Sequence, residues 1–242
     1  QCADDEVLII TLSGKLSGQM RPDKVIPFKY DKAEAERKFL AFAKKKWFLP
    51  RDFFAKDQAD KIAGIYFPFW VTDADTNSHL SAKATKVRTW RRGDTQYTET
   101  SHFSISRGGF IHFEDIVSSA ITEADKEMLE GILPYPSDSM IDFSMPYLSG
   151  FVAKKRNIER ASLTDEVRGK MRNYARTLLE STVTGYSTVN VLGTDVNVQK
   201  SHWEYTLMPI WMLTYHKGKK TYTYAMNGYT GKIYGKLPIS LP

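Results

Sequence analysis

Two apolar runs dominate the pattern of hydrophobic and polar positions along the chain. Residues 65–71 (Ile-Tyr-Phe-Pro-Phe-Trp-Val) and 206–212 (Thr-Leu-Met-Pro-Ile-Trp-Met) each place a proline two residues before a tryptophan. Aromatic and β-branched residues in a short apolar run predict a buried strand. Proline cannot donate to a strand ladder, so each strand should have an edge, a bulge or a break there. Each run follows an amphipathic helical stretch and leads into a polar, hairpin-like segment, which predicts two copies of one helix-then-sheet unit.

Apolar residues at spacings of three and four predict a main helix before each of these runs. The first helix begins after Asp31, which is followed by Glu34 at the spacing of a capping box. The second helix begins near Thr164 and ends at Gly185. Their apolar faces contain Ala35, Phe39, Phe42, Ala43 and Trp47 in the first helix, and Val167, Met171, Tyr174, Leu178 and Leu179 in the second.

Alternation of polar and apolar residues predicts antiparallel strands between residues 61 and 113, with one face of the sheet in contact with water. Glycines indicate two tight turns in this region, at residues 92–94 and 107–109. Further strands are expected at residues 186–191, 195–198 and 203–215. The Asn227-Gly228 and Thr230-Gly231 pairs supply the positive φ angles that later turns need.

These elements predict the α+β class, with two similar helix-plus-antiparallel-sheet units that are consistent with an internal duplication. Residues 1–25 form a lead-in or linker, residues 26–135 the first unit and residues 136–242 the second, divided at Pro134 and Pro136. We therefore expect Trp70 and Trp211 at equivalent places in two similar sheets, each packed under its own helix.

Composition narrows the class of protein but not its chemistry. Hydrophobic residues make up 42% of the chain and charged residues 26%, which is typical of a globular domain. The net charge of +6 favours an anionic partner, either nucleic acid or a membrane surface. The single cysteine, Cys2, excludes an internal disulfide and favours a reducing compartment. No apolar run is long enough to span a bilayer, and the chain starts at Gln1, as a piece of a longer protein would.

The most pointed chemical feature is a basic and aromatic cluster beside the first turn, formed by Arg88, Trp90, Arg91 and Arg92. Arginine next to an exposed aromatic ring can hold a phosphate while the ring stacks on a base. In the alternative interpretation, Trp90 packs on the sheet and the arginines pair with Asp94 and Glu99 across the hairpin.

A second candidate site contains Asp73, Asp75 and His79, which alternation places on one face of a strand. Such a trio could bind a metal or act in acid–base chemistry, as in a metal-dependent hydrolase. The alternative is a solvated polar strand. No metal-binding histidine pair, nucleophile elbow or phosphate-binding glycine loop occurs in the sequence, which argues against the enzymes built on those motifs.

Several longer motifs stand out along the chain, namely residues 20–29 (Met-Arg-Pro-Asp-Lys-Val-Ile-Pro-Phe-Lys), 64–70, 86–93, 97–100, 185–190, 208–211 and 225–232. In these segments the sequence resembles the bacterial TFIIB-type zinc-ribbon-containing proteins, a family of unknown function. The resemblance runs over most of the chain from about residue 16.

This resemblance implies a zinc ribbon before the present chain and membrane segments after it. Cys2 would then be the last zinc ligand of the ribbon, and residues 237–242 would approach a membrane anchor. The fragment itself is expected to hold no cofactor, and zinc is expected only in the full-length protein. The implied location is the cytoplasm, at the inner face of the membrane.

The sequence leads to one main functional hypothesis and one alternative. The main hypothesis is a non-enzymatic protein-interaction or scaffold domain with protein partners and no small-molecule substrate. The alternative is a nucleic-acid-binding accessory module that uses Arg88, Trp90, Arg91 and Arg92. The membrane would be reached only through segments outside this chain.

Overall fold

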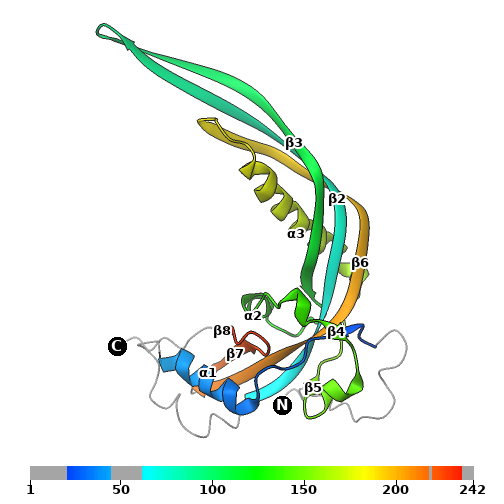
Figure 1. Cartoon of the computed structure of the whole chain (residues 1–242). Helices are drawn as coiled ribbons and strands as arrows, with labels where there is room; N and C mark the ends of the chain where they lie inside the picture. Colours follow the sequence, from blue (N-terminus) through cyan, green and yellow to red (C-terminus); the bar gives the residue numbers. More distant parts are fainter. Residues whose placement is uncertain (1–20, 45–61, 218–219, 236–242) are drawn as a thin grey trace. The chain divides into compact units, whose positions relative to one another are not determined.

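The computed structural model describes residues 21–44, 62–217 and 220–235, and the fold is drawn in Figure 1. The helices are α1 (Lys32–Lys44), α2 (Lys126–Gly131) and α3 (Arg160–Ser181), with short 3-10 turns η4 (Ser137–Ser139) and η5 (Met145–Leu148). The strands are β1 (Lys24–Val25), β2 (Ile62–Arg92), β3 (Thr95–Ser119), β4 (Ile141–Asp142), β5 (Val152–Ala153), β6 (Thr188–Lys217), β7 (Lys220–Asn227) and β8 (Ile233–Gly235).

All eight strands belong to one mixed sheet. The main order is β3-β2-β6-β1-β4, while β5 pairs with β2, β7 with β6, and β8 with β7. The β1–β6 and β2–β5 pairs are parallel. The predicted α+β class with two similar helix-plus-antiparallel-sheet units is therefore wrong, because the described chain is mostly strand and its strands form one mixed sheet. An apolar run predicts a buried strand, but which strand pairs with it depends on contacts between residues distant in the sequence. Here the two Pro-x-Trp runs lie on the adjacent strands β2 and β6.

The chain divides into two compact units, each assembled from separated segments. We call one the core unit (Gln1–Val71, Val117–Glu159 and Glu204–Pro242) and the other the hairpin unit (Thr72–Ile116 and Arg160–Trp203). Strands β2, β3 and β6 each contribute residues to both.

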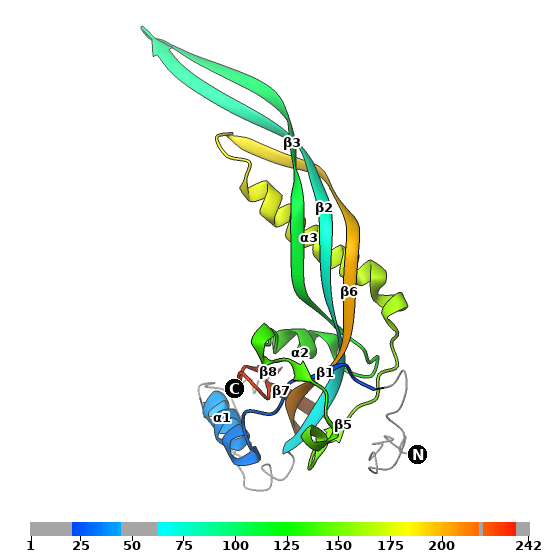
Figure 2. The same cartoon turned by 45° about the vertical axis from the view of Figure 1, so that its right-hand side comes forward.

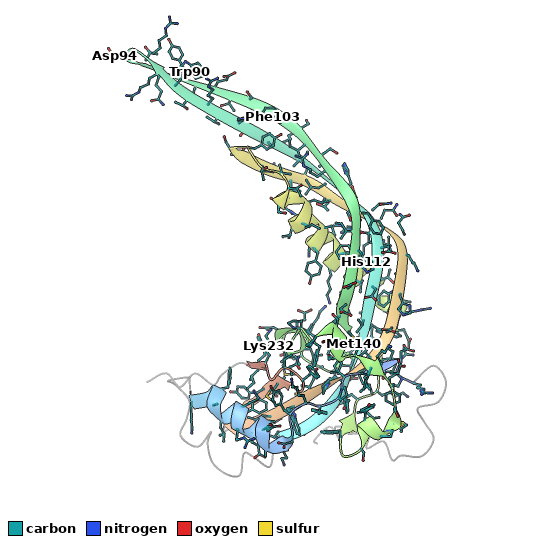
Figure 3. All side chains as sticks on the ribbon, in the orientation of Figure 1. Trp90, Asp94, Phe103, His112, Met140 and Lys232 are labelled. Atoms are coloured by element: carbon teal, nitrogen blue, oxygen red, sulfur yellow. The ribbon has the colours of Figure 1, made fainter. Side chains whose placement is uncertain are left out.

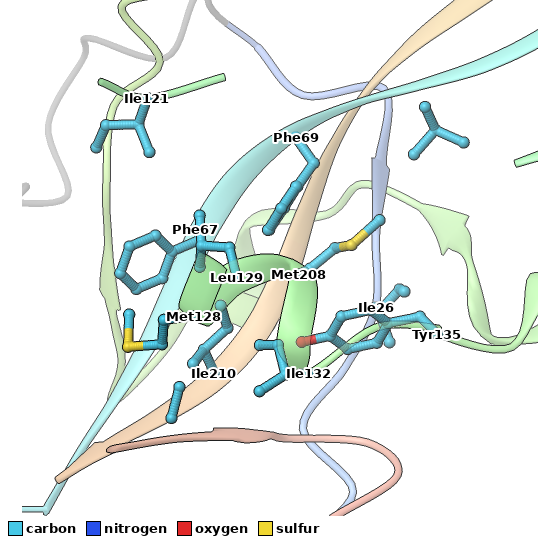
Figure 4. Packing of buried hydrophobic residues seen from close by; sticks show 12 residues of the cluster. Ile26, Phe67, Phe69, Ile121, Met128, Leu129, Ile132, Tyr135, Met208 and Ile210 are labelled. Carbon is cyan, nitrogen blue, oxygen red and sulfur yellow. The ribbon is translucent and has the colours of Figure 1, made fainter. Parts of the chain in front are cut away.

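In the core unit, the sheet is buried on both faces. Figure 4 shows one face, where Phe67, Phe69, Met208 and Ile210 pack with residues of α2 and the segment after it. On the other face, Ala35, Phe39 and Ala43 of α1 pack with Trp211, Leu213, Tyr224 and Met226. Successive side chains of a strand point to opposite faces, so a strand covered on both sides must be apolar at every position. This double burial explains why the two runs are continuous.

The capping box of α1 is confirmed. The Asp31 carboxylate accepts a hydrogen bond from the Glu34 amide at 2.8 Å, and the Glu34 carboxylate accepts one from the Asp31 amide at 3.0 Å. Of its predicted apolar face, Ala35, Phe39 and Ala43 are buried, and Trp47 lies outside the described residues.

Both prolines lie inside strands that continue past them. The Pro68 carbonyl accepts from the amide of Ala120, one residue after the end of β3. The Pro209 carbonyl accepts from the amide of Gly228, one residue after the end of β7. Within a strand, the N–H and C=O groups of one residue point to the same side. The N–H that each proline lacks would therefore point to the place where the neighbouring strand ends, as its carbonyl does.

Each tryptophan of the two Pro-x-Trp runs forms a hydrogen bond from the sheet to the backbone of a loop. The Trp211 indole N–H donates to the Tyr30 carbonyl at 3.0 Å, and that of Trp70 donates to the Ile158 carbonyl at 2.9 Å. Trp211 packs with α1, the helix expected over Trp70, and not with the helix of its own predicted unit. Trp70 instead lies 5.0 Å from the buried Arg156 guanidinium, so the expected equivalence of the two residues is wrong.

The two predicted turn glycines Gly228 and Gly231 differ in backbone conformation. Gly231 has a positive φ of 77°, as predicted, whereas Gly228 does not have one. Gly228 is required for space, because a Cβ atom there would lie 2.7 Å from the Phe28 ring and 2.8 Å from Cβ of Pro209.

Asn227 joins the β7–β8 connection to the segment after α2. Its amide nitrogen donates to the carbonyls of Ile132 at 3.0 Å and Pro134 at 3.4 Å. Its amide oxygen accepts from the backbone N–H groups of Tyr229 at 2.9 Å and Thr230 at 2.8 Å. The residue is fully buried, so water cannot replace these bonds if the side chain is removed.

The hairpin unit consists of a long β2–β3 hairpin, the first half of β6, and α3. The predicted turn at residues 92–94 is confirmed, with Gly93 at a φ of 62°, but residues 107–109 lie within β3. In Figures 1 and 2, α3 runs along one face of these strands. Its buried stripe contains Leu163, Val167, Met171, Ala175 and Leu179. The predicted stripe included Tyr174 and Leu178, which are exposed.

We expect Asn227→Ala to destabilise the protein by about 2–4 kcal/mol, because it leaves two carbonyls and two amide N–H groups without their partner in a dry environment. Urea denaturation followed by circular dichroism measures this change. Asn190→Ala is the matched control, since Asn190 is exposed on β6, and it should stay within about 0.5 kcal/mol of the wild type. Equal effects of the two substitutions would contradict the role given to Asn227.

Candidate functional site

In the part of the chain that the structure describes, nothing covers either face of the far end of the β2–β3 hairpin. Every residue from 86 to 100 is exposed, whereas residues 72–84 of β2 alternate between buried and less buried positions. Toward the turn, the last described hydrogen bonds between β2 and the segment before β6 involve Ser187. Its amide donates to the Thr85 carbonyl at 2.7 Å, and its Oγ accepts from the Val87 amide at 2.9 Å. Beyond Val87 the hairpin is therefore a two-stranded ribbon with open faces and edges.

This ribbon is stiffened by an exposed aromatic stack. The rings of Trp90 on β2 and Tyr97 on β3 lie 5.7 Å apart and are nearly parallel, with an interplanar angle of 12°. The Arg88 guanidinium lies 5.7 Å from the Trp90 ring. Isolated two-stranded hairpins are marginal in water, and cross-strand aromatic and cation–π contacts contribute about 0.5–1 kcal/mol each. Both rings still expose about two fifths of their surface, 42% and 43%.

The four predicted binding residues lie at the end of β2, where strand alternation puts Arg88, Trp90 and Arg92 on one face of the ribbon and Arg91 on the other. Figure 3 shows Trp90 beside Asp94 at the turn, with Arg91 and Arg92 between them in the sequence. Among the described residues, no carboxylate lies within ion-pair distance of Arg91 or Arg92, so the expected pairing with Asp94 and Glu99 is not found. The arginines are thus available to an anionic group of another molecule.

Charge is divided sharply along the hairpin. Residues 83–107, which we call the basic end, contain six Lys or Arg residues and two acidic ones, a net charge of +4. Residues 72–82 and 108–116, which we call the acidic end, contain four acidic residues and no Lys or Arg, a net charge of −4. The acidic residues are Asp73, Asp75, Glu114 and Asp115.

The second candidate site, Asp73, Asp75 and His79, is not brought together. Asp73 accepts from the Asp115 amide at 2.9 Å, Asp75 bonds His112 at 2.6 Å, and His79 bonds Ser106 at 2.9 Å. Each side chain has its own partner on β3. Within the described part of the chain, no three His, Cys, Asp or Glu side chains gather as a metal ion requires. Cys2, the predicted ribbon ligand, lies outside the described residues.

His112 is a contact that sequence reasoning missed. Its Nδ1 lies 2.6 Å from Asp75 and its Nε2 3.3 Å from Glu114. The hydrogen bond that the Asp75 carboxylate accepts from His112, followed by the charges of Asp75 and Glu114, raises the pKa of His112 above the usual 6.5. Only the pairing register of β2 and β3 could have revealed this contact, because Asp75 and His112 are distant in the sequence.

The outer edge of β3 is unprotected. β3 ends the sheet on its side, and no described strand pairs with its outer edge. Between residues 100 and 113 it contains no proline and a single charged Lys, Arg, Asp or Glu residue, Arg107. Proteins usually protect long edge strands with charges, prolines or short length, because open N–H and C=O groups pair with other strands. This edge is a ready site for strand addition.

No helix in the described residues is both long enough and apolar enough to cross a membrane.

We expect Asp75→Asn to lower the pKa of His112 toward 6.5, because the substitution removes its main partner. The pKa is read from NMR titration of the imidazole protons. Since the folded protein has the higher pKa, the stability that protonated His112 contributes is present below pH 6.5 and is lost as the pH rises through the folded pKa. Asp94→Asn, at the turn, is the matched control, and an unchanged pKa in Asp75→Asn would contradict the contact.

Comparison with known proteins gives one informative relationship. No family model matches the chain, and no solved structure matches it. The chain is similar to the uncharacterised protein YdjG of Bacillus subtilis (strain 168), with 35% identity over 229 residues. The alignment covers 95% of this chain and 67% of the relative. Identity at this level over two thirds of the relative shows common descent, and the chain belongs to the family of Bacillus subtilis YdjG.

Proposed function

We propose that this chain is a non-enzymatic protein-interaction domain, a scaffold that offers its hairpin unit to partner proteins. The single observation that carries this proposal is the outer edge of β3, which is long, almost uncharged between residues 100 and 113, and without a strand partner in the described part of the chain. An extended segment of a partner can add to such an edge through main-chain hydrogen bonds.

Exposed apolar side chains support the same location. Eleven large hydrophobic residues of the described chain are exposed, and eight of them belong to the hairpin unit. Phe103 and Phe110 lie on β3 itself, with 40% and 65% of their surface exposed. In strand addition the main chain supplies affinity and side chains next to the edge supply specificity, so these two rings are the natural selectivity elements.

The distribution of titratable groups supports binding over catalysis. Asp73, Asp75 and His79 each bond a different residue of β3, and this separation leaves no shared point for a substrate atom. From the zinc-ribbon resemblance we also propose that Cys2 is a zinc ligand in the full-length protein. The same resemblance supports a cytoplasmic location at the inner face of the membrane, reached through segments outside this chain.

A photo-crosslinking amino acid placed at Phe110 in the full-length protein should capture specific proteins in native cells. The same group at Leu40, an exposed residue of α1, is the control and should not capture them. Phe110→Lys with the crosslinker at Phe103 should reduce capture at least about ten-fold, equivalent to about 1.4 kcal/mol, because an edge lysine opposes strand addition. Identical captured proteins from Phe110 and Leu40 would overturn the proposal.

A second candidate function, nucleic-acid binding, is favoured by the geometry of the basic end. Arg88 lies over the exposed Trp90 ring, and Arg91 and Arg92 have no carboxylate partner among the described residues. A two-stranded ribbon is narrow enough to enter the major groove of DNA, and its aromatic rings can stack on single-stranded bases.

If this candidate is correct, Arg91→Ala with Arg92→Ala should weaken DNA binding and reduce the salt slope by about 2, since each phosphate contact contributes about 0.9. Fluorescence anisotropy over a series of salt concentrations measures both quantities. Arg168→Ala with Arg172→Ala, on the exposed face of α3, is the matched control and should leave the slope unchanged. Binding that responds neither to salt nor to the first pair of substitutions would exclude this function.

A further inference from the structure

We propose that the partner of the β3 edge is a second copy of this chain, which pairs with it antiparallel so that each basic end lies against the other copy's acidic end. The inference rests on the proposed function, because it uses the same edge and names its occupant.

The charge pattern selects both the partner and its direction. One hairpin carries +4 at its basic end and −4 at its acidic end. Two such hairpins side by side repel when they are parallel, because like ends meet. When they are antiparallel, two opposite-charge contacts form at once, one at each end. Two identical contacts related by a two-fold axis are what an isologous dimer requires.

The middle of the edge fits the position of this two-fold axis. Gly108 and Gly109 lie within β3, where glycine weakens a strand. Gly109 is exposed, and a Cβ atom there would meet nothing within 4 Å, so packing inside the described chain does not require glycine. Glycine in a strand often marks close approach of another backbone.

The same axis avoids a charge conflict. An axis through Arg107, the only Lys, Arg, Asp or Glu residue between residues 100 and 113, would place two arginines opposite each other, which is destabilising. An axis between Gly108 and Gly109 places Arg107 opposite Phe110 of the second copy, where the guanidinium can lie on an exposed ring. With this axis, residues 108–116 of one copy lie opposite residues 101–109 of the other, which include Arg107 and are level with Lys83 and Lys86 of β2. The acidic end of each copy therefore faces these three basic residues.

Charge reversal tests the arrangement in the full chain. Lys83→Glu with Lys86→Glu lowers the basic end from +4 to 0, and Asn77→Lys with Glu114→Lys changes the acidic end from −4 to −1. All four residues are exposed, so folding should be retained and is checked by circular dichroism. Sedimentation equilibrium gives the mass and the dimer dissociation constant.

We expect the wild-type chain to form dimers whose dissociation constant rises at least about ten-fold between about 0.05 M and about 0.5 M salt, because salt screens the end contacts. Each variant alone should dimerise at least ten-fold more weakly. An equimolar mixture of the two variants should regain dimers, since the unchanged acidic end of one meets the unchanged basic end of the other. A purely structural effect of the substitutions cannot produce this rescue.

Hydrogen exchange locates the contact. Amides of residues 100–113 should become protected as the protein concentration rises, while those of β7 should not change. A wild-type chain that stays monomeric, assemblies larger than dimers, a mixture without rescue, or a dimer that leaves residues 100–113 unprotected would each overturn the inference. A monomer whose Phe110 crosslinks to a different protein would overturn it and leave the proposed function standing.

Discussion

Burial of β2 and β6 on both faces of the sheet is the constraint on which the rest of the structure depends. Along β6, Met208 and Ile210 belong to one cluster, and Trp211 and Leu213 belong to the other. Helix α2 contributes to the first cluster and α1 to the second. This two-sided core lets both strands continue through a proline, because the missing donors fall where neighbouring strands end. It also anchors the strands from which the hairpin unit is built.

The environment of β2 changes in steps along its length. Residues 66–72 are buried at every position, residues 72–84 alternate, and residues 86–92 are all exposed. A strand normally terminates when its packing ends, since an uncovered ribbon gains little from burial. Here the chain continues, with a stacked Trp90–Tyr97 pair and a cation–π contact in place of a core. Continuation without burial is expected where the exposed surface serves recognition, and that is the basis of the proposals above.

Several features of the candidate site were visible in the sequence, and others were not. The Arg88-to-Arg92 cluster and the turn at Gly93 follow from local composition and glycine chemistry. The Gly108-Gly109 pair predicts a turn but lies within β3, because glycine is found in turns and in open strands alike. Tyr174 and Leu178 matched a helical stripe, yet the buried stripe is centred on Ala175, since only the sheet decides which side of α3 is covered. The contact of His112 with Asp75 depends on strand register, which no local pattern specifies.

The sequence by itself determined the local features: the two buried runs, the capping box of α1, and the turn at residues 92–94. Each depends on residues close together in the chain, where propensity, spacing and side-chain chemistry act directly. Tertiary structure decided that the two runs share one sheet, that β3 forms its open edge, and that Asn227 joins two distant segments. These outcomes depend on long-range pairing, in which similar strands compete for the same neighbours and only the packing of the whole core selects among them.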